Sequence, residues 1–120
     1  MGLVSSNFLV NNNMNKYKKE YDELIKYRIN NAPPNTEYIE IHHIIPRSLG
    51  GTNYKDNLVA LLAREHLHAH WLLFKHYEYE NPTGEECLKM LCAVDMMLTG
   101  FHSNTIKHID VITEEEYQRF

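Results

Sequence analysis

Residues 41–70 read IHHIIPRSLGGTNYKDNLVALLAREHLHAH, and this stretch determines most of the predicted architecture. It opens on two adjacent histidines, His42 and His43, at the end of a short apolar run. A loop rich in Gly, Pro, Asn and Asp follows, and then the apolar segment LVALL. The remainder has the length and composition of an amphipathic helix. The predicted order is therefore strand, long loop, strand and helix.

Helical patterns flank this unit. Residues 15–29, NKYKKEYDELIKYRI, place apolar side chains at helical spacing, and the run NNAPPN then stops the helix. The alternation in TEYIEI, residues 36–41, predicts the first strand. A last helix is predicted to begin near residue 83 and to end at Gly100.

This organisation predicts one domain. We expect a flexible lead-in over residues 1–13 and a single domain over 14–120. Within it, the strand–loop–strand–helix unit covers about residues 37–77, and a helical extension covers about 83–120.

Composition and charge restrict the class of protein. Apolar residues make up 43 % of the 120 residues and charged residues 23 %, which are ordinary values for a folded domain. No apolar run is long enough to span a membrane, and the start does not resemble a secretory signal. Cys87 and Cys92 are expected to be reduced thiols in a core, which fits a cytoplasmic protein.

The net charge of −4 argues against an extended basic surface of the kind that binds nucleic acid. The excess of acid lies almost entirely in residues 79–120, whereas the middle of the chain is balanced. A local basic patch therefore remains compatible with this sequence.

Histidines concentrate in the central unit, where five of the eight lie within residues 42–70. His66 and His70 are four apart and lie on one face of the predicted helix, a spacing that offers two imidazoles to one metal ion. A third ligand is needed, and either His42 or His43 can supply it. Such a pair is often only a solvent-facing feature, but its occurrence with the doublet and the glycine-rich loop favours a metal site with an open position.

The motifs His-His-Ile-x-Pro, Ser-x-Gly-Gly, Asn-Leu-Val and Glu-His-x-x-x-His occur here in the order typical of one family. On these residues the chain resembles the HNH endonucleases, which have the ββα-metal fold, and especially their small phage-encoded and homing-type members. The resemblance implies an α+β fold: a core made of a two-stranded antiparallel hairpin and a helix, flanked by additional helices.

The resemblance also implies roles for individual residues. His42 matches the metal ligand of the first strand, and His43 matches the general base. Asn57 matches the middle Asn of the motif, which in some relatives bonds across the loop and in others touches the metal. His66 and His70 match helix positions that bind metal in histidine-rich members.

The implied activity is metal-dependent hydrolysis of DNA phosphodiester bonds by an endonuclease or nickase, leaving 5′-phosphate and 3′-hydroxyl ends. The implied cofactor is one divalent ion, Mg, Mn, Zn or Ni. Neighbouring strand residues point in different directions, so His42 can face the ion while His43 faces the water that it deprotonates.

Charged residues around the motif are weaker candidates for a functional role than the histidines. Arg47, Lys55 and Arg64 are candidates for contacts to DNA phosphates. The alternative for each is an ordinary solvated charge, which the sequence favours for Lys55. Glu65 would either orient a ligand imidazole or favour the first turn of the helix. His68 points away from His66 and His70.

The expected partner is duplex DNA, contacted through its backbone. The motif and its flanking helices nearly fill 120 residues, so we expect weak sequence specificity, or specificity supplied by a homodimer or a partner. The expected location is the cytoplasm of a bacterial or phage-infected cell. Two alternatives remain: a non-catalytic binding or inhibitor protein on the same scaffold, and a structural zinc module, which the spacing of Cys87 and Cys92 disfavours.

Overall fold

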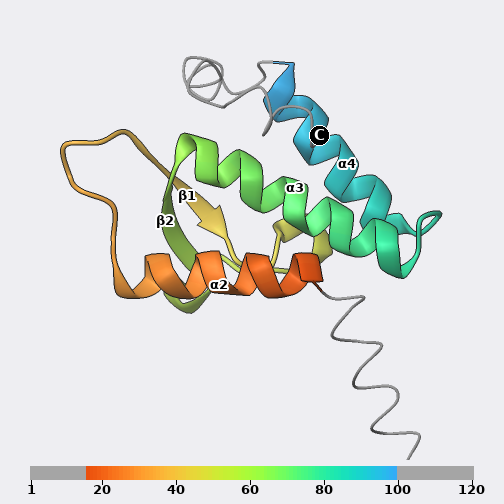
Figure 1. Ribbon diagram of the computed structural model, residues 1–120, viewed down its shortest axis with the longest axis horizontal. Helices are drawn as coiled ribbons and strands as arrows, with labels where there is room; N and C mark the ends of the chain where they lie inside the picture. The colour runs from red at the N-terminus through yellow and green to blue at the C-terminus, as the bar shows by residue number, and fades with distance from the viewer. Residues whose placement is uncertain (1–15, 100–120) are drawn as a thin grey trace, which may run out of the picture.

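The computed structural model describes residues 16–99, and within this range the chain folds around one central helix. The helices are α2 (Lys16–Asn30), α3 (Ala63–Glu80) and α4 (Glu85–Leu98), and the strands are β1 (Ile39–His43) and β2 (Leu58–Leu62). Helix α3 packs against α2 on one side and against α4 on the other, and the hairpin lies across α2 and α3 (Figure 1). The predicted α+β fold, a hairpin and helix flanked by further helices, is confirmed.

The two strands pair antiparallel in a register that places the histidine doublet at the loop end of the hairpin. His42 lies opposite Val59, and His43 lies opposite Leu58. The connecting loop contains two short 3-10 turns, η1 (Arg47–Leu49) and η2 (Lys55–Asn57). The strand LVALL matches the prediction residue for residue, whereas the first strand begins later than residue 36 and continues through the histidines.

The first strand turns its polar side chains inward. Along β1, Ile39 and Ile41 are exposed, whereas Glu40 is half-buried and His42 is fully buried. Alternation normally places the apolar residues of a half-buried strand against the core. Here the inward face of β1 carries the polar groups of a site instead, and β2 supplies the apolar residues of the hairpin, Val59 and Leu61.

The helices contribute the rest of the core through side chains spaced three and four residues apart. Tyr21 and Ile25 are buried on α2, and Leu67, Trp71 and Leu72 are buried on α3. The buried residues of α4 are Cys87, Met90, Val94 and Met97. Cys87 is a buried free thiol as predicted, but Cys92 is exposed because it lies on the opposite side of α4, so its predicted core position is wrong.

Two predicted segments lie outside the described residues: the flexible lead-in at 1–13 and the part of the C-terminal extension from residue 100 onward. Within residues 16–99, no helix combines the length and the apolar character needed to cross a membrane.

Candidate metal centre and histidine site

Three imidazoles meet between the hairpin and the central helix. His42 comes from the inward face of β1, and His66 and His70 lie one turn apart on α3. The ring centroids form a nearly equilateral triangle with sides of 5.1 Å (His42–His66), 5.1 Å (His42–His70) and 5.0 Å (His66–His70). One candidate ligand nitrogen from each ring lies within 4.8 Å of the other two. This cluster can hold a metal ion, and it is the set of three residues that the sequence indicated.

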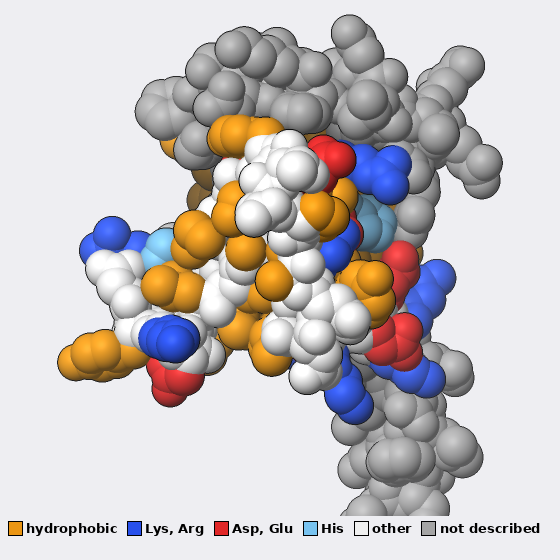
Figure 2. All heavy atoms as spheres, turned by 90° about the vertical axis from the view of Figure 1, so that its left-hand side faces the viewer, with side chains coloured by type: hydrophobic (Ala, Val, Ile, Leu, Met, Phe, Trp, Pro, Cys, Tyr) orange, Lys and Arg blue, Asp and Glu red, His pale blue; other side chains and the backbone are white. Residues whose placement is uncertain are grey.

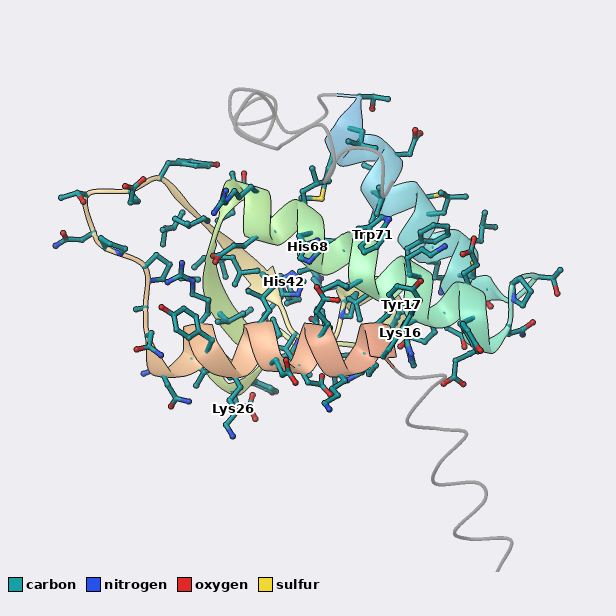
Figure 3. The ribbon with its side chains drawn as sticks, in the orientation of Figure 1. Lys16, Tyr17, Lys26, His42, His68 and Trp71 are labelled. Atoms are coloured by element: carbon teal, nitrogen blue, oxygen red, sulfur yellow. The ribbon has the colours of Figure 1, made fainter. Side chains whose placement is uncertain are left out.

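The environment keeps His42 in the form that binds metals. Its side chain is 0 % exposed, and burial lowers its pKa to about 2, with the nearby His70 and His66 acting in the same direction. Figure 3 labels His42 inside the fold, where its ring meets the ring of Tyr21 edge-on. The imidazole is therefore neutral across the physiological pH range, and a neutral imidazole is a metal ligand.

A carboxylate holds the second imidazole. His66 Nδ1 lies 2.8 Å from Glu40 Oε1, and the two side chains are only 14 % and 12 % exposed. Because the carboxylate only accepts, Nδ1 carries the proton and Nε2 keeps its lone pair. The Tyr38 hydroxyl in turn donates to Glu40 Oε2 at 2.9 Å. Glu40 was not among the residues predicted from the sequence, although its position two residues before His42 places both on one face of the strand.

A hydroxyl lies against the first imidazole. Tyr21 Oη is 2.6 Å from His42 Nε2, and the same hydroxyl donates to the carbonyl of Ile44 at 2.7 Å. Tyr21 is a further contact that the sequence analysis did not foresee. It lies on α2, 21 residues before His42, and only the packing of α2 on the hairpin brings the two together.

The second histidine of the doublet has separate surroundings. His43 is half-buried at the end of β1, and its Nε2 lies 2.8 Å from Asn53 Oδ1 in the loop. When Nε2–H donates to this amide oxygen, the lone pair of the ring is on Nδ1. The residue therefore has a nitrogen suited to accept a proton and is not part of the three-imidazole cluster.

Asn57 holds the long loop together. Its Nδ2 donates to the carbonyls of Ile45 (3.0 Å) and Thr52 (2.8 Å), and its Oδ1 accepts from the Ile45 backbone N–H at 2.8 Å. Gly51 is packed so closely that a Cβ there would collide with the Ile45 carbonyl. These contacts correspond to the loop-bridging role, one of the two that the resemblance left open for Asn57.

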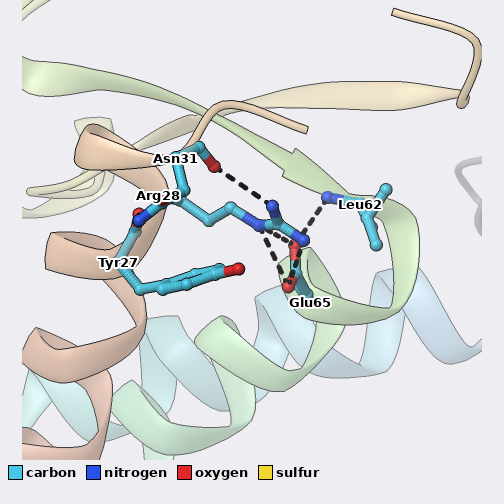
Figure 4. A network of polar contacts seen from close by, with 5 residues as sticks. All are labelled: Tyr27, Arg28, Asn31, Leu62 and Glu65. Atoms are coloured by element: carbon cyan, nitrogen blue, oxygen red, sulfur yellow. Dashed lines mark hydrogen bonds and ion pairs between the residues drawn. The ribbon is translucent and has the colours of Figure 1, made fainter. Parts of the chain in front are cut away.

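Glu65 does not orient an imidazole, so that hypothesis is wrong. It accepts from the Leu62 backbone N–H at 2.9 Å, at the start of α3, as expected for an acidic residue in a first turn. It also pairs with Arg28, whose Nε and Nη2 donate to the carboxylate at 2.9 and 3.0 Å (Figure 4). This forked pair ties the end of α2 to the start of α3.

The three candidate phosphate contacts are all exposed. Arg47 lies in η1, Lys55 in η2 and Arg64 in the first turn of α3. His68 points away from the cluster, as predicted: it stacks on Trp71 with ring centroids 5.7 Å apart and lies 3.3 Å from Glu20 (Figure 3). On the face shown in Figure 2, hydrophobic side chains are spread over the centre and most of the Lys and Arg side chains lie toward the margins.

Comparison with known proteins identifies relatives with nuclease names. Residues 25–70 match the sequence profile of the family described as HNH endonuclease. The chain is 52 % identical over 61 residues to probable mobile endonuclease E of Enterobacteria phage T4, covering 51 % of this chain and 43 % of that protein. It is 43 % identical over 79 residues to probable mobile endonuclease B of the same phage, covering 63 % and 29 %.

A third relative comes from an alga. The uncharacterized 38.5 kDa protein in psbA intron 1 of Chlamydomonas moewusii is 38 % identical over 72 residues, covering 60 % of this chain and 20 % of that protein. The chain thus spans less than half the length of each of these relatives. No solved structure matches the chain significantly. The family match, the hairpin-and-helix core and the named relatives agree that residues 25–70 of this chain are similar to HNH endonuclease domains.

Proposed function

We propose that this chain is a metal-dependent DNA endonuclease or nickase in which one divalent ion and His43 carry out phosphodiester hydrolysis. The observation that carries the proposal is the separation of two histidine environments at the end of β1. His42 joins a buried three-imidazole cluster, whereas His43, the next residue, bonds to the loop through Asn53. An ion site and a nearby proton acceptor are the two components that metal-assisted hydrolysis uses, and adjacent residues supply them here.

His42, His66 and His70 would hold the ion. Among the described residues, His42 Nδ1 is buried without a hydrogen-bond partner, which is costly unless the nitrogen binds something else. When bound, a divalent ion supplies Lewis acidity to a phosphate oxygen and to the leaving oxygen. Three imidazoles suit Zn²⁺ or Ni²⁺ better than Mg²⁺ or Mn²⁺, which prefer oxygen ligands.

His43 would take the proton from the attacking water. As the water oxygen forms its bond to phosphorus, the proton passes to His43 Nδ1 and the bond from phosphorus to the 3′ oxygen breaks. The leaving 3′ oxygen takes a proton from solvent water and His43 later returns its proton to solvent, so the products are a 5′-phosphate and a 3′-hydroxyl. Asn53 supports this step because its amide oxygen, 2.8 Å from His43 Nε2, favours the ring form with a vacant Nδ1. Asn57 contributes by holding the loop and not by touching the reacting atoms.

Duplex DNA is the proposed substrate, with phosphate contacts from Arg47, Lys55 and Arg64. All three side chains are exposed on the loop and the first turn of α3. The chain as a whole is acidic, with a net charge of −4, so we infer a small local footprint and weak sequence specificity, or specificity supplied by a second copy or a partner. The phage origin of two relatives supports a place among phage mobile endonucleases.

Nicking of supercoiled plasmid tests this proposal. The EDTA-treated protein is assayed alone and with Mg²⁺, Mn²⁺, Ni²⁺ or Zn²⁺, beside His43→Ala and the control His68→Ala. We expect no nicking without metal, strong nicking with at least one transition ion, and a loss of about 100-fold or more in His43→Ala. His68→Ala should behave as wild type. Equal nicking by His43→Ala and wild type, or undiminished nicking in EDTA, would overturn the proposal.

A further inference from the structure

Tyr21 occupies a defined place beside the metal centre. Its side chain is 1 % exposed, and its hydroxyl lies between the fully buried His42 and the carbonyl of Ile44. The two contacts measure 2.6 Å to His42 Nε2 and 2.7 Å to the Ile44 oxygen. A phenol oxygen carries one proton, so it donates one hydrogen bond and accepts others.

The hydrogen bonds of the Tyr21 hydroxyl determine which ring nitrogen of His42 carries the proton. The Ile44 carbonyl can only accept, so the Tyr21 proton is used there. The short contact to His42 is then a hydrogen bond only if the imidazole donates, which places the ring proton on Nε2. This leaves the lone pair on Nδ1, the buried atom that has no hydrogen-bond partner in residues 16–99.

We propose that Tyr21 is a positioning residue that locks His42 in the Nε2–H form, so that Nδ1 is the nitrogen presented to the metal ion. The inference rests on the metal-dependent function proposed above. It means that the site uses two different nitrogen atoms. His66 presents Nε2 because Glu40 holds its Nδ1, whereas His42 presents Nδ1 because Tyr21 holds its Nε2.

The difference in burial explains why a carboxylate supports His66 whereas a hydroxyl supports His42. The side chains of Glu40 and His66 are 12 % and 14 % exposed, so the carboxylate remains partly hydrated. At His42 no surface is exposed, and a carboxylate there would need to be stripped of water. A neutral hydroxyl fixes the ring without that cost. Tyr21 also anchors the end of β1 through Ile44, beside His43.

The test combines a spectroscopic readout with a binding readout on the full chain. Long-range ¹H–¹⁵N correlation spectra of the metal-free protein at neutral pH report which ring nitrogen of each histidine is protonated. Co²⁺ titrations followed by absorbance report affinity without DNA. Both are run on wild type, Tyr21→Phe and the control Tyr17→Phe, which removes a hydroxyl one turn earlier on α2 from a ring packed on Trp71.

We expect wild type and Tyr17→Phe to show His42 protonated on Nε2 alone. Tyr21→Phe should show both ring forms in exchange and bind Co²⁺ about 10- to 100-fold more weakly. An Nδ1–H form of His42 in wild type would overturn the proposal whether or not the variant folds. Co²⁺ affinity of a folded Tyr21→Phe equal to that of Tyr17→Phe would do the same.

These outcomes are separable from those of the proposed function. If Co²⁺ binding depends on Tyr21 as expected but the protein never nicks plasmid, the positioning role stands and the nuclease proposal fails. If the protein nicks plasmid in a metal-dependent way but the wild-type ring form is Nδ1–H, the nuclease proposal stands and the role of Tyr21 is overturned.

Discussion

Glu40 and His66 are 26 residues apart in the chain, yet Glu40 Oε1 lies 2.8 Å from His66 Nδ1 at the base of the histidine cluster. The carboxylate holds the ring of His66 through its Nδ1–H, which leaves Nε2 as the nitrogen that can bind a metal ion. Carboxylates in this position strengthen metal binding by a histidine. They also bring negative charge to a site whose three candidate ligands are all imidazoles.

Replacing Glu40 by Gln is therefore expected to weaken Co²⁺ binding about tenfold, because the amide can still accept from Nδ1–H but carries no charge. Absorbance titration of the metal-free protein measures the change. Glu37→Gln is the control, since Glu37 is an exposed carboxylate just before β1. Equal affinities in the two variants would show that Glu40 does not tune the site.

The loop between the strands gives a second prediction, from two neighbouring glycines. A side chain at Gly51 would collide with the Ile45 carbonyl and approach Asn57 Nδ2 to 2.9 Å, whereas Gly50 has open space but a φ of 94°. Gly50→Ala should lower the free energy of unfolding by about 1 to 2 kcal/mol through backbone strain alone. Gly51→Ala should lower it by about 3 kcal/mol or more, because backbone must move. Urea unfolding measures both changes. Similar losses of unfolding free energy in the two variants would contradict the close packing of Gly51 against Ile45.

Much of this arrangement could be predicted from the sequence because it is local. The i, i+4 spacing of His66 and His70 indicates two of the three imidazoles, and the resemblance to HNH endonucleases selects His42 over His43 as the third. The supporting contacts could not be predicted in the same way. Tyr21 reads as an ordinary core residue of an amphipathic helix, and only the packing of α2 on β1 brings its hydroxyl to His42.

Two carboxylates show where local patterns mislead. By sequence, Glu65 is a candidate to orient a ligand imidazole because it lies next to His66, but adjacent residues in a helix point in different directions, and Glu65 pairs with Arg28. Glu40 is distant in sequence and was read only as part of a strand pattern. Its spacing of two from His42 put it on the same strand face, and this signal was available.

The pair formed by Arg28 and Glu65 gives a stability prediction. The two side chains are 11 % and 18 % exposed, and the guanidinium donates through two nitrogens. Lysine cannot reproduce this fork, so Arg28→Lys should lower the free energy of unfolding by about 1 to 2 kcal/mol. Asp22→Asn, which breaks the exposed pair with Lys18 on the same helix, should cost less than about 0.5 kcal/mol. Urea unfolding curves that show equal losses would refute the difference.

Acid is expected to destabilise the metal-free protein. Burial lowers the pKa of His42 to about 2 and also lowers the pKa of His76, so both rings take up a proton less readily in the folded chain than in the unfolded chain. The unfolded chain takes up their protons once the pH falls below about 6.5. Above that pH, neither ring lowers the free energy of unfolding. Below it, the free energy of unfolding falls by about 1.4 kcal/mol per pH unit for each ring, until the pH reaches the pKa of that ring in the folded chain.

Urea unfolding of EDTA-treated protein at several pH values measures this slope. His42→Gln should lower this slope by about 1.4 kcal/mol per pH unit, which corresponds to one proton, because one of the two buried rings is gone. A slope that is identical in wild type and His42→Gln would mean that His42 is already protonated in the folded chain, which would contradict its burial between Tyr21, His66 and His70.

The central claim is that His42, His66 and His70 bind one ion while His43 stands apart to accept a proton. Titration of Co²⁺ into wild type and single-histidine variants, alongside plasmid nicking, tests it most directly. We expect one ion per chain in wild type, loss of tight binding in His42→Gln, His66→Gln and His70→Gln, and wild-type binding without nicking in His43→Gln. Wild-type Co²⁺ affinity in any of the first three variants, or loss of the ion in His43→Gln, would contradict the account.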